Sequence, residues 1–183
     1  MHPFVPVRRR ALAACVLAAW YYTGGKRPYG YRGLGEVFVF VFFGLVAVSG
    51  TVLVQVGAVP WPTWPVAVCI GALACSILVA NNLRDLRGDL AVGKHTLATR
   101  LGDRGTRRFY VALVALAAVA VVVVAVGTTW WALLGLVGIA LLVPAVRRVL
   151  TGAQGPELIA VLTSSGTAEL AYALGLAVGL LLA

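Results

Sequence analysis

The chain has 183 residues, of which 61% are hydrophobic and only 11% charged, and its formal net charge is +9. Its mean hydropathy of +0.97 excludes an ordinary soluble domain and a disordered chain. Lipid cannot satisfy backbone polar groups, so each spanning segment should be a helix. The expected fold class is therefore all-α, a polytopic membrane helical bundle that forms a single membrane domain over residues 1–183.

Apolar runs separated by polar or glycine-rich stretches predict about six helical segments. In chain order they cover residues 11–22, 36–56, 66–80, 110–126, 130–146 and 157–183. The first is too short to cross roughly 30 Å of hydrocarbon at about 1.5 Å per residue, so we expect it to be part of a span. The turn at 60–65, PWPTWP, has two tryptophans and no charge, which places it on the outer side of the membrane.

Basic residues gather in alternate connections between these segments. Residues 23–35, 81–108 and 147–156 hold 3, 7 and 2 of the fifteen Lys and Arg residues, and such an excess marks the cytoplasmic side. We therefore interpret the positive charge as a signal of orientation and predict no nucleic-acid partner. The three arginines at 8–10 fall on the opposite side if the first segment crosses. Either that segment does not span, or the chain begins inside a larger architecture.

The polar stretch 81–101, NNLRDLRGDLAVGKHTLATRL, follows directly on an apolar segment and contains two of the six acidic residues. If the preceding helix continues through it, Asn81, Asp85 and Asp89 share one face because they are four residues apart. Mg²⁺ is commonly held by one or two carboxylates while it bridges to substrate phosphates. The pair of aspartates therefore predicts a cation site, oriented by Asn81 or Asn82.

Basic side chains in the same stretch extend this prediction. Lys94, with Arg84 or Arg87, could bind the outer oxygens of a diphosphate, whose negative charge grows as it leaves. The alternative is a solvated helix face on which Arg84 and Arg87 form ion pairs with the aspartates. The position at the end of a membrane helix favours the functional interpretation, because ionisable groups near a span are often functional.

The remaining candidate residues have simpler interpretations. Cys15, Cys69 and Cys75 lie in apolar runs without CxxC spacing, so we expect them to pack and not to bind zinc. By composition, the loop 23–35 is a basic, aromatic segment at the membrane interface. The predicted boundaries place no acidic or basic residue in the middle of a span, which argues against a transporter or channel.

Two stretches resemble a known family. NNLRDLRGDLAVGKHTLATRLG is similar to the second Asp-rich motif of the UbiA-type intramembrane prenyltransferases, above all the 1,4-dihydroxy-2-naphthoate polyprenyltransferases of menaquinone biosynthesis. WYYTGGKRPYGYRGLGEVFVFVFFGLVAVSGT resembles a loop and the following helix of the same branch. The two motifs occur in the family's order, and the resemblance covers the chain from about Leu12 onward.

The resemblance implies a bundle of nine helices around a cavity open sideways to lipid, in a multi-pass protein of the plasma membrane with cytoplasmic active-site loops at 23–35 and 81–108. The implied reaction moves a polyprenyl chain from polyprenyl diphosphate to an aromatic acid, 1,4-dihydroxy-2-naphthoate. Mg²⁺ held by Asp-rich motifs assists departure of diphosphate. The ring carboxylate leaves as carbon dioxide, and the product is demethylmenaquinone.

Residue roles follow from the same resemblance. Asp85 and Asp89 correspond to catalytic Mg²⁺ ligands, and Lys94 to a catalytic diphosphate contact. The implied substrate-binding residues are Asn81, Asn82, Arg84, Lys26, Arg27 and Tyr29, with Tyr31 as an alternative to Tyr29.

The chain departs from the family in one respect. Family members carry an earlier Asp-rich motif and about three further helices, whereas the acids of this chain outside 81–108 are Glu36, Glu157 and Glu169. We therefore expect the C-terminal two-thirds of the fold, with low activity in isolation. The alternative function is a non-catalytic membrane remnant, or a subunit that needs a partner segment supplying the first motif.

Overall fold

The computed structural model describes residues 13, 16–17, 20 and 33–183. Most of the predicted segment 11–22 lies outside these residues, as do the predicted substrate contacts Lys26, Arg27, Tyr29 and Tyr31. Every element of regular structure within 33–183 is a helix. The prediction of an all-α fold is confirmed.

The described helices follow one another with short connections. In chain order they are α2 (Gly35–Val39), the π-helix η2 (Phe40–Val46), α3 (Ala47–Val56), α4 (Thr63–Ala91), α5 (Leu97–Gly127), the 3-10 helix η3 (Trp130–Gly135), α6 (Leu136–Ala140), α7 (Val143–Leu150), η4 (Gly155–Leu158) and α8 (Ile159–Leu181). Four continuous helices are long and apolar enough to cross a membrane: Gly35–Val56, Thr63–Ala91, Leu97–Gly127 and Gly155–Leu181. They contain the predicted segments 36–56, 66–80 and 110–126 and nearly all of 157–183.

The predicted segment 130–146 is a broken helix. Trp130–Ala140 and Val143–Leu150 meet at an angle of 42°, with Pro144 in the first turn of α7. Proline has no N–H for the helix ladder, so it starts a new helix more readily than it continues one. At the break Leu142 is fully buried, whereas Leu141 and Val143 on either side of it are exposed.

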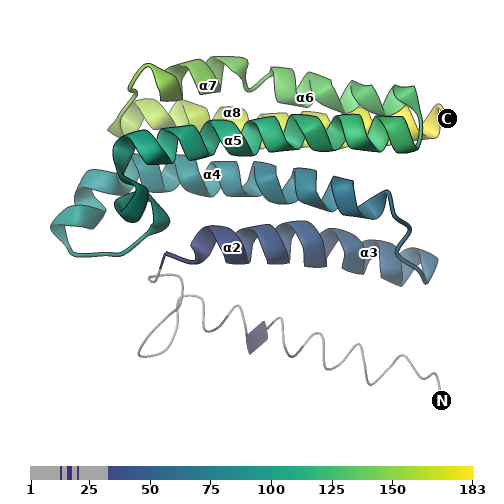
Figure 1. Cartoon of the computed structure of the whole chain (residues 1–183), viewed down its shortest axis with the longest axis horizontal. Helices are drawn as coiled ribbons and strands as arrows, with labels where there is room; N and C mark the ends of the chain where they lie inside the picture. Colours follow the sequence, from purple (N-terminus) through teal and green to yellow (C-terminus); the bar gives the residue numbers. More distant parts are fainter. Residues whose placement is uncertain (1–12, 14–15, 18–19, 21–32) are drawn as a thin grey trace.

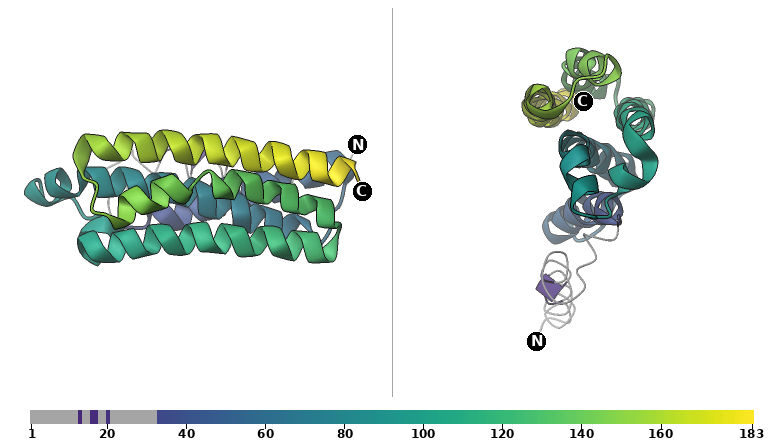
Figure 2. Two further views of the ribbon diagram at one scale, coloured as in Figure 1. Left: turned by 90° about the horizontal axis from the view of Figure 1, so that it is seen from above. Right: turned by 90° about the vertical axis from the view of Figure 1, so that its left-hand side faces the viewer.

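Helix α4 is the centre of the bundle. The continuous helix α2–η2–α3 packs along one side of it, and α5 and α8 pack along others (Figures 1 and 2). In its most apolar window α4 is 56% buried, whereas the window in Gly35–Val56 is only 6% buried. Most of the surface of α2–η2–α3 is therefore available to lipid or to further helices.

Two close helix contacts are made through glycine. A Cβ added to Gly44 would lie 2.6 Å from Gly71 Cα and 2.7 Å from the Ala67 carbonyl oxygen, so η2 and α4 touch backbone to backbone. A Cβ on Gly138 of α6 would lie 2.3 Å from the Tyr172 backbone nitrogen of α8. Small residues serve this purpose in membranes, where helices associate through van der Waals packing.

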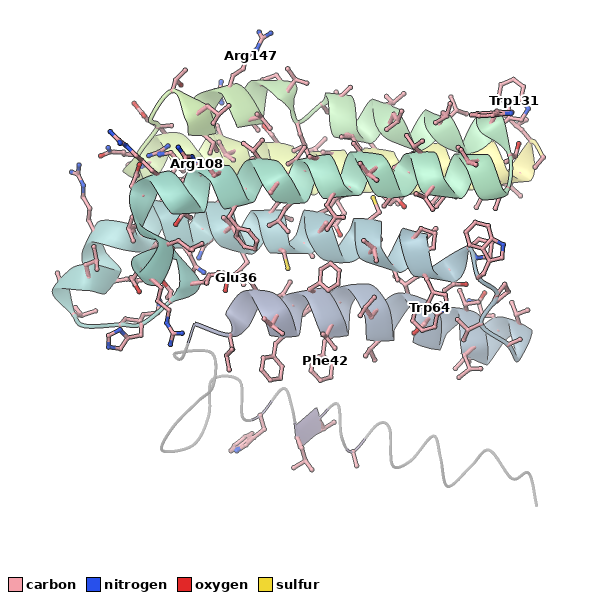
Figure 3. The ribbon with its side chains drawn as sticks, viewed as in Figure 1. Glu36, Phe42, Trp64, Arg108, Trp131 and Arg147 are labelled. Atoms are coloured by element: carbon pink, nitrogen blue, oxygen red, sulfur yellow. The ribbon has the colours of Figure 1, made fainter. Side chains whose placement is uncertain are left out.

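The two ends of the bundle differ in chemistry. Glu36, Arg108 and Arg147 lie at one end, and Trp64 and Trp131 at the other (Figure 3). The uncharged turn between α3 and α4 is at the tryptophan end, where the Trp61 ring occupies the space that a side chain on Gly127 would need. Arg108 and Arg147, from two of the predicted basic connections, thus share one end of the bundle.

The prediction that residues 81–108 form a loop was wrong, because most of them are helical. Helix α4 continues to Ala91 and α5 begins at Leu97, so only residues 92–96 connect them. A helix of 29 residues is about 43 Å long and exceeds a hydrocarbon core of about 30 Å. The polar residues from 81 onward thus lie on a rigid helical extension beyond the apolar part of α4.

Helix α5 has a kink at its polar end. Gly102 has φ 67° and ψ 178°, which separates the first turns from the long apolar helix. Beyond the kink, the buried Arg107 binds the Asp103 carboxylate with Nε–Oδ2 at 2.7 Å, and it also donates to the carbonyl oxygens of Val149 and Ala153. This guanidinium therefore fastens α5 to the last turn of α7 and to the connection that follows it.

One acid lies where none was expected. Glu169 is in the middle of α8 and half-buried, so the statement that no ionisable residue lies mid-span was wrong. The error came from placing Glu169 near the start of its helix, whereas the span runs from Gly155 to Leu181. No ion pair to this carboxylate occurs within residues 33–183, and a single acid does not outline an ion path.

Candidate active site

The polar end of α4 presents four of the predicted residues on one sector. At about 100° per residue, Asn82 and Asp89 lie within about 20° of each other, Asp85 about 60° from Asn82, and Asn81 about 100° from it. Asn82 and Asp89 are each only 8% exposed, while Asn81 and Asp85 are partly exposed. The stripe predicted for Asn81, Asp85 and Asp89 is present, and Asn82 belongs to its buried edge.

Lys94 reaches this stripe because of how α4 ends. Gly93 has φ 66°, and the backbone N–H groups of Gly93 and Lys94 donate to the carbonyl oxygens of Leu90 and Asp89. This is the Schellman arrangement, which needs a left-handed residue after the helix and favours glycine there. The chain turns back, and Lys94 Nζ lies 3.1 Å and 3.2 Å from the two carboxylate oxygens of Asp89.

Asp85 forms an ion pair with Arg84. Arg84 Nε and Nη2 each donate to one Asp85 oxygen at 2.8 Å, and the two side chains are 30% and 39% exposed. Arg87 is exposed on the same extension. Paired guanidinium and carboxylate groups at a partly exposed site contribute little stability, because water screens their attraction. Both partners can therefore change contacts when an anion or a cation arrives.

Glu36 is the residue that sequence analysis missed. It stands at the start of α2, 4% exposed, and its Oε1 accepts a hydrogen bond of 2.9 Å from Asn82 Nδ2. The Cys75 thiol donates to its backbone oxygen at 3.0 Å. The only signal in the sequence is an acid at the first turn of an apolar span, and this gives no information about a partner 46 residues away.

The donor set fits a cation that is shared with a substrate. Among the described residues, no group of three or more His, Cys, Asp and Glu side chains could hold a metal ion. Two carboxylates one turn apart are, however, what Mg²⁺ uses when substrate phosphates and water complete its shell. Asp85 and Asp89 therefore suit a bridged magnesium–diphosphate unit better than a protein-only metal site.

Comparison with known proteins assigns the fold to a family. Residues 10–161 match the UbiA prenyltransferase family. The chain belongs to this family. The polar end of α4, with its paired aspartates, lies within the matched region, and so does Glu36.

Relatives extend over most of this family member's length. It is 50% identical over 171 residues to 1,4-dihydroxy-2-naphthoate octaprenyltransferase of Mycobacterium leprae, covering 93% of this chain and 58% of the relative. For the protein of the same name from Mycobacterium tuberculosis the identity is 49% over 165 residues, covering 90% and 56%. The Haemophilus influenzae protein of that name is 36% identical over 170 residues, covering 90% and 55%.

The family member thus spans a little more than half the length of these relatives. No solved structure matches it.

Proposed function

We propose that this chain supplies the second diphosphate-binding half of a prenyltransferase that transfers a polyprenyl chain to 1,4-dihydroxy-2-naphthoate with loss of carbon dioxide, giving demethylmenaquinone. The observation that carries the proposal is a pair of aspartates on a rigid extension of a spanning helix, each beside a basic side chain. The name borne by the Mycobacterium leprae relative supports the choice of acceptor.

In this proposal Asp85 and Asp89 hold Mg²⁺ together with the diphosphate. The bound ion neutralises negative charge that develops on the departing diphosphate. Lys94 and Arg84 leave their carboxylates and bind outer phosphate oxygens, so positive charge stays beside the leaving group throughout the reaction. Asn81 and Asn82, on the same sector of α4, are polar supports of this substrate-binding site.

The charge of the site favours joint binding of metal and diphosphate. Asp85 with Arg84, and Asp89 with Lys94, each sum to zero charge, so a bare divalent cation gains little by entering. A diphosphate draws the two basic side chains toward itself and frees the carboxylates. Asp85 and Asp89 would then be free to hold a divalent cation beside the substrate anion.

The surroundings of the site belong to the same proposal. The protein spans the plasma membrane with the polar end of its bundle on the cytoplasmic side. The segments 23–35 and 81–108 line the active site. Lys26, Arg27 and Tyr29 contact diphosphate or the acceptor ring. In this proposal a partner segment carrying the first Asp-rich motif completes the site.

The test is prenyl transfer in lipid vesicles with 1,4-dihydroxy-2-naphthoate and a polyprenyl diphosphate, with Mg²⁺ and then with a chelator. The chain is assayed alone and together with a segment that carries the missing motif. We expect product only with metal, and a loss of at least a hundredfold in Asp85→Asn and Asp89→Asn. Glu157→Gln, an exposed acid at the same end of the bundle, is the matched control and should keep parental activity.

Two outcomes would contradict this function. If both aspartate variants remain active, the carboxylates do not serve the reaction. If neither the chain nor its combination with the added segment gives product, the non-catalytic alternative holds, and the chain is a membrane remnant of the family.

A further inference from the structure

We infer that Glu36 is a positioning residue, which fixes the carboxamide of Asn82 so that its side-chain oxygen is presented to the metal–diphosphate unit at Asp85 and Asp89. The inference rests on the proposed function. It concerns an acid on α2 to which neither the sequence motifs nor the comparisons give a role.

The Asn82 amide is oriented by its hydrogen bond to Glu36. A carboxylate only accepts hydrogen bonds, so the group that faces Glu36 Oε1 at 2.9 Å must be the amide nitrogen. The amide is planar, so Asn82 Oδ1 points away from Glu36. Because the Glu36 carboxylate binds the amide nitrogen of Asn82, the amide oxygen of Asn82 is left for other contacts.

The side-chain oxygen of Asn82 has no hydrogen-bond partner in the described structure. Within the described part of the chain, Asn82 Oδ1 accepts no hydrogen bond from protein. Of the side-chain nitrogen and oxygen atoms described there, the Tyr172 hydroxyl is the one both fully buried and without a partner, so Asn82 Oδ1 keeps some exposed surface. An oriented, unpaired oxygen about one turn before Asp85, on the same sector of α4, is a suitable ligand for a hard cation or for its bound water.

Contacts other than the Glu36 carboxylate hold α2 and η2 against α4. The contact between η2 and α4 is made by Gly44 and Gly71, and the thiol of Cys75 binds the backbone oxygen of Glu36 and not its carboxylate. Docking of α2 on α4 thus has its own contacts. A buried carboxylate is costly in a membrane protein, and here its partner within residues 33–183 is one amide.

The matching variant is Glu36→Gln, which keeps size and hydrogen bonding. Glutamine can donate as well as accept, so it allows Asn82 to turn its nitrogen toward the cation. Removal of a partner that orients a metal ligand typically lowers metal affinity by about tenfold or more. The probe is Mn²⁺ with inorganic diphosphate, measured by the electron paramagnetic resonance signal of free Mn²⁺ over the chain in lipid nanodiscs, against protein-free discs.

We expect Glu36→Gln to weaken Mn²⁺ binding about tenfold while the unfolding temperature stays at the parental value. Asn82→Ala should weaken it by a similar factor, and the double variant should be no worse than Asn82→Ala, because Glu36 acts through Asn82. Unchanged affinity in Glu36→Gln overturns the inference. So does a further loss when Glu36→Gln is added to Asn82→Ala.

The variant Asp85→Asn distinguishes failure of the proposed metal site from failure of the role of Glu36. If it weakens Mn²⁺ binding and Glu36→Gln does not, the proposed site stands and the role of Glu36 is refuted. If the parent chain binds no Mn²⁺ above the blank, or Asp85→Asn binds as the parent does, the metal site and the inference fall together.

Discussion

The contact between Gly44 and Gly71 should decide whether the first described span stays docked on α4. Replacing Gly44 by Ala puts a methyl group 2.6 Å from Gly71 Cα, whereas carbon atoms in contact prefer about 3.5–4.0 Å. The helices must separate by about 1 Å. Gly50→Ala in the same span is the matched control, because nothing lies within 4 Å of a Cβ there.

The cost can be worked from the same geometry. Overpacking of a tight contact typically costs about 1–3 kcal/mol. A gap of about 1 Å also removes a quarter to a half of the dispersion energy of the atoms around it. Because helix association in lipid depends on such packing, local opening of this interface should become about 5 to 150 times more populated. Gly50→Ala should instead stabilise its helix slightly, since alanine is the better helix former.

Two buried thiols report this opening separately. Cys75 is 2% exposed and faces Glu36 of α2, while Cys69 is fully buried in the bundle core. With Cys15 replaced by Ser, single-thiol chains in nanodiscs are labelled by a membrane-permeant maleimide. We expect Gly44→Ala to accelerate labelling of Cys75 at least fivefold and to leave Cys69 unchanged. Equal Cys75 rates in Gly44→Ala and Gly50→Ala would refute the reasoning.

The remaining predictions concern the polar end of the bundle. Arg107→Met leaves the carbonyl oxygens of Val149 and Ala153 without their donor and should lower the unfolding free energy by about 3 kcal/mol; a loss under 1 kcal/mol in thermal unfolding would contradict the fastening role. Gly93→Ala places a side chain at φ 66° and should destabilise by about 1 kcal/mol, whereas Gly88→Ala, with open space in a regular helix, should stabilise. Similar unfolding temperatures for these two alanine variants would exclude a strained turn.

The spans were predictable because each is a long apolar run, and no competing structure satisfies the backbone in lipid. The end of α4 was predicted less well. Hydropathy falls sharply at Asn81, but the helix ends ten residues later, at a glycine turn that closes its last carbonyl groups. Gly93 was the available signal, since glycine just after a polar helix end predicts a cap.

The break between α6 and α7 had a signal as well, in Pro144 within an apolar run. Its angle of 42° was not predictable, because no local pattern in the sequence sets how two helix pieces pack against the rest of a bundle. The pairing of Glu36 with Asn82 had no signal at all. It joins residues far apart in sequence, and it exists only because Gly44 and Gly71 bring η2 so close to α4 that the two polar ends coincide.

The isolated position of Gly35–Val56 bears on how the protein is assembled. This span leads to α4 through the exposed turn that begins at Gly57, where a Cβ would meet nothing within 4 Å. Spanning helices insert independently before they associate, so the covalent link there serves mainly to raise the local concentration of one helix near the other. Two polypeptides divided at this turn could meet by diffusion in the plane of the bilayer and rebuild the same bundle.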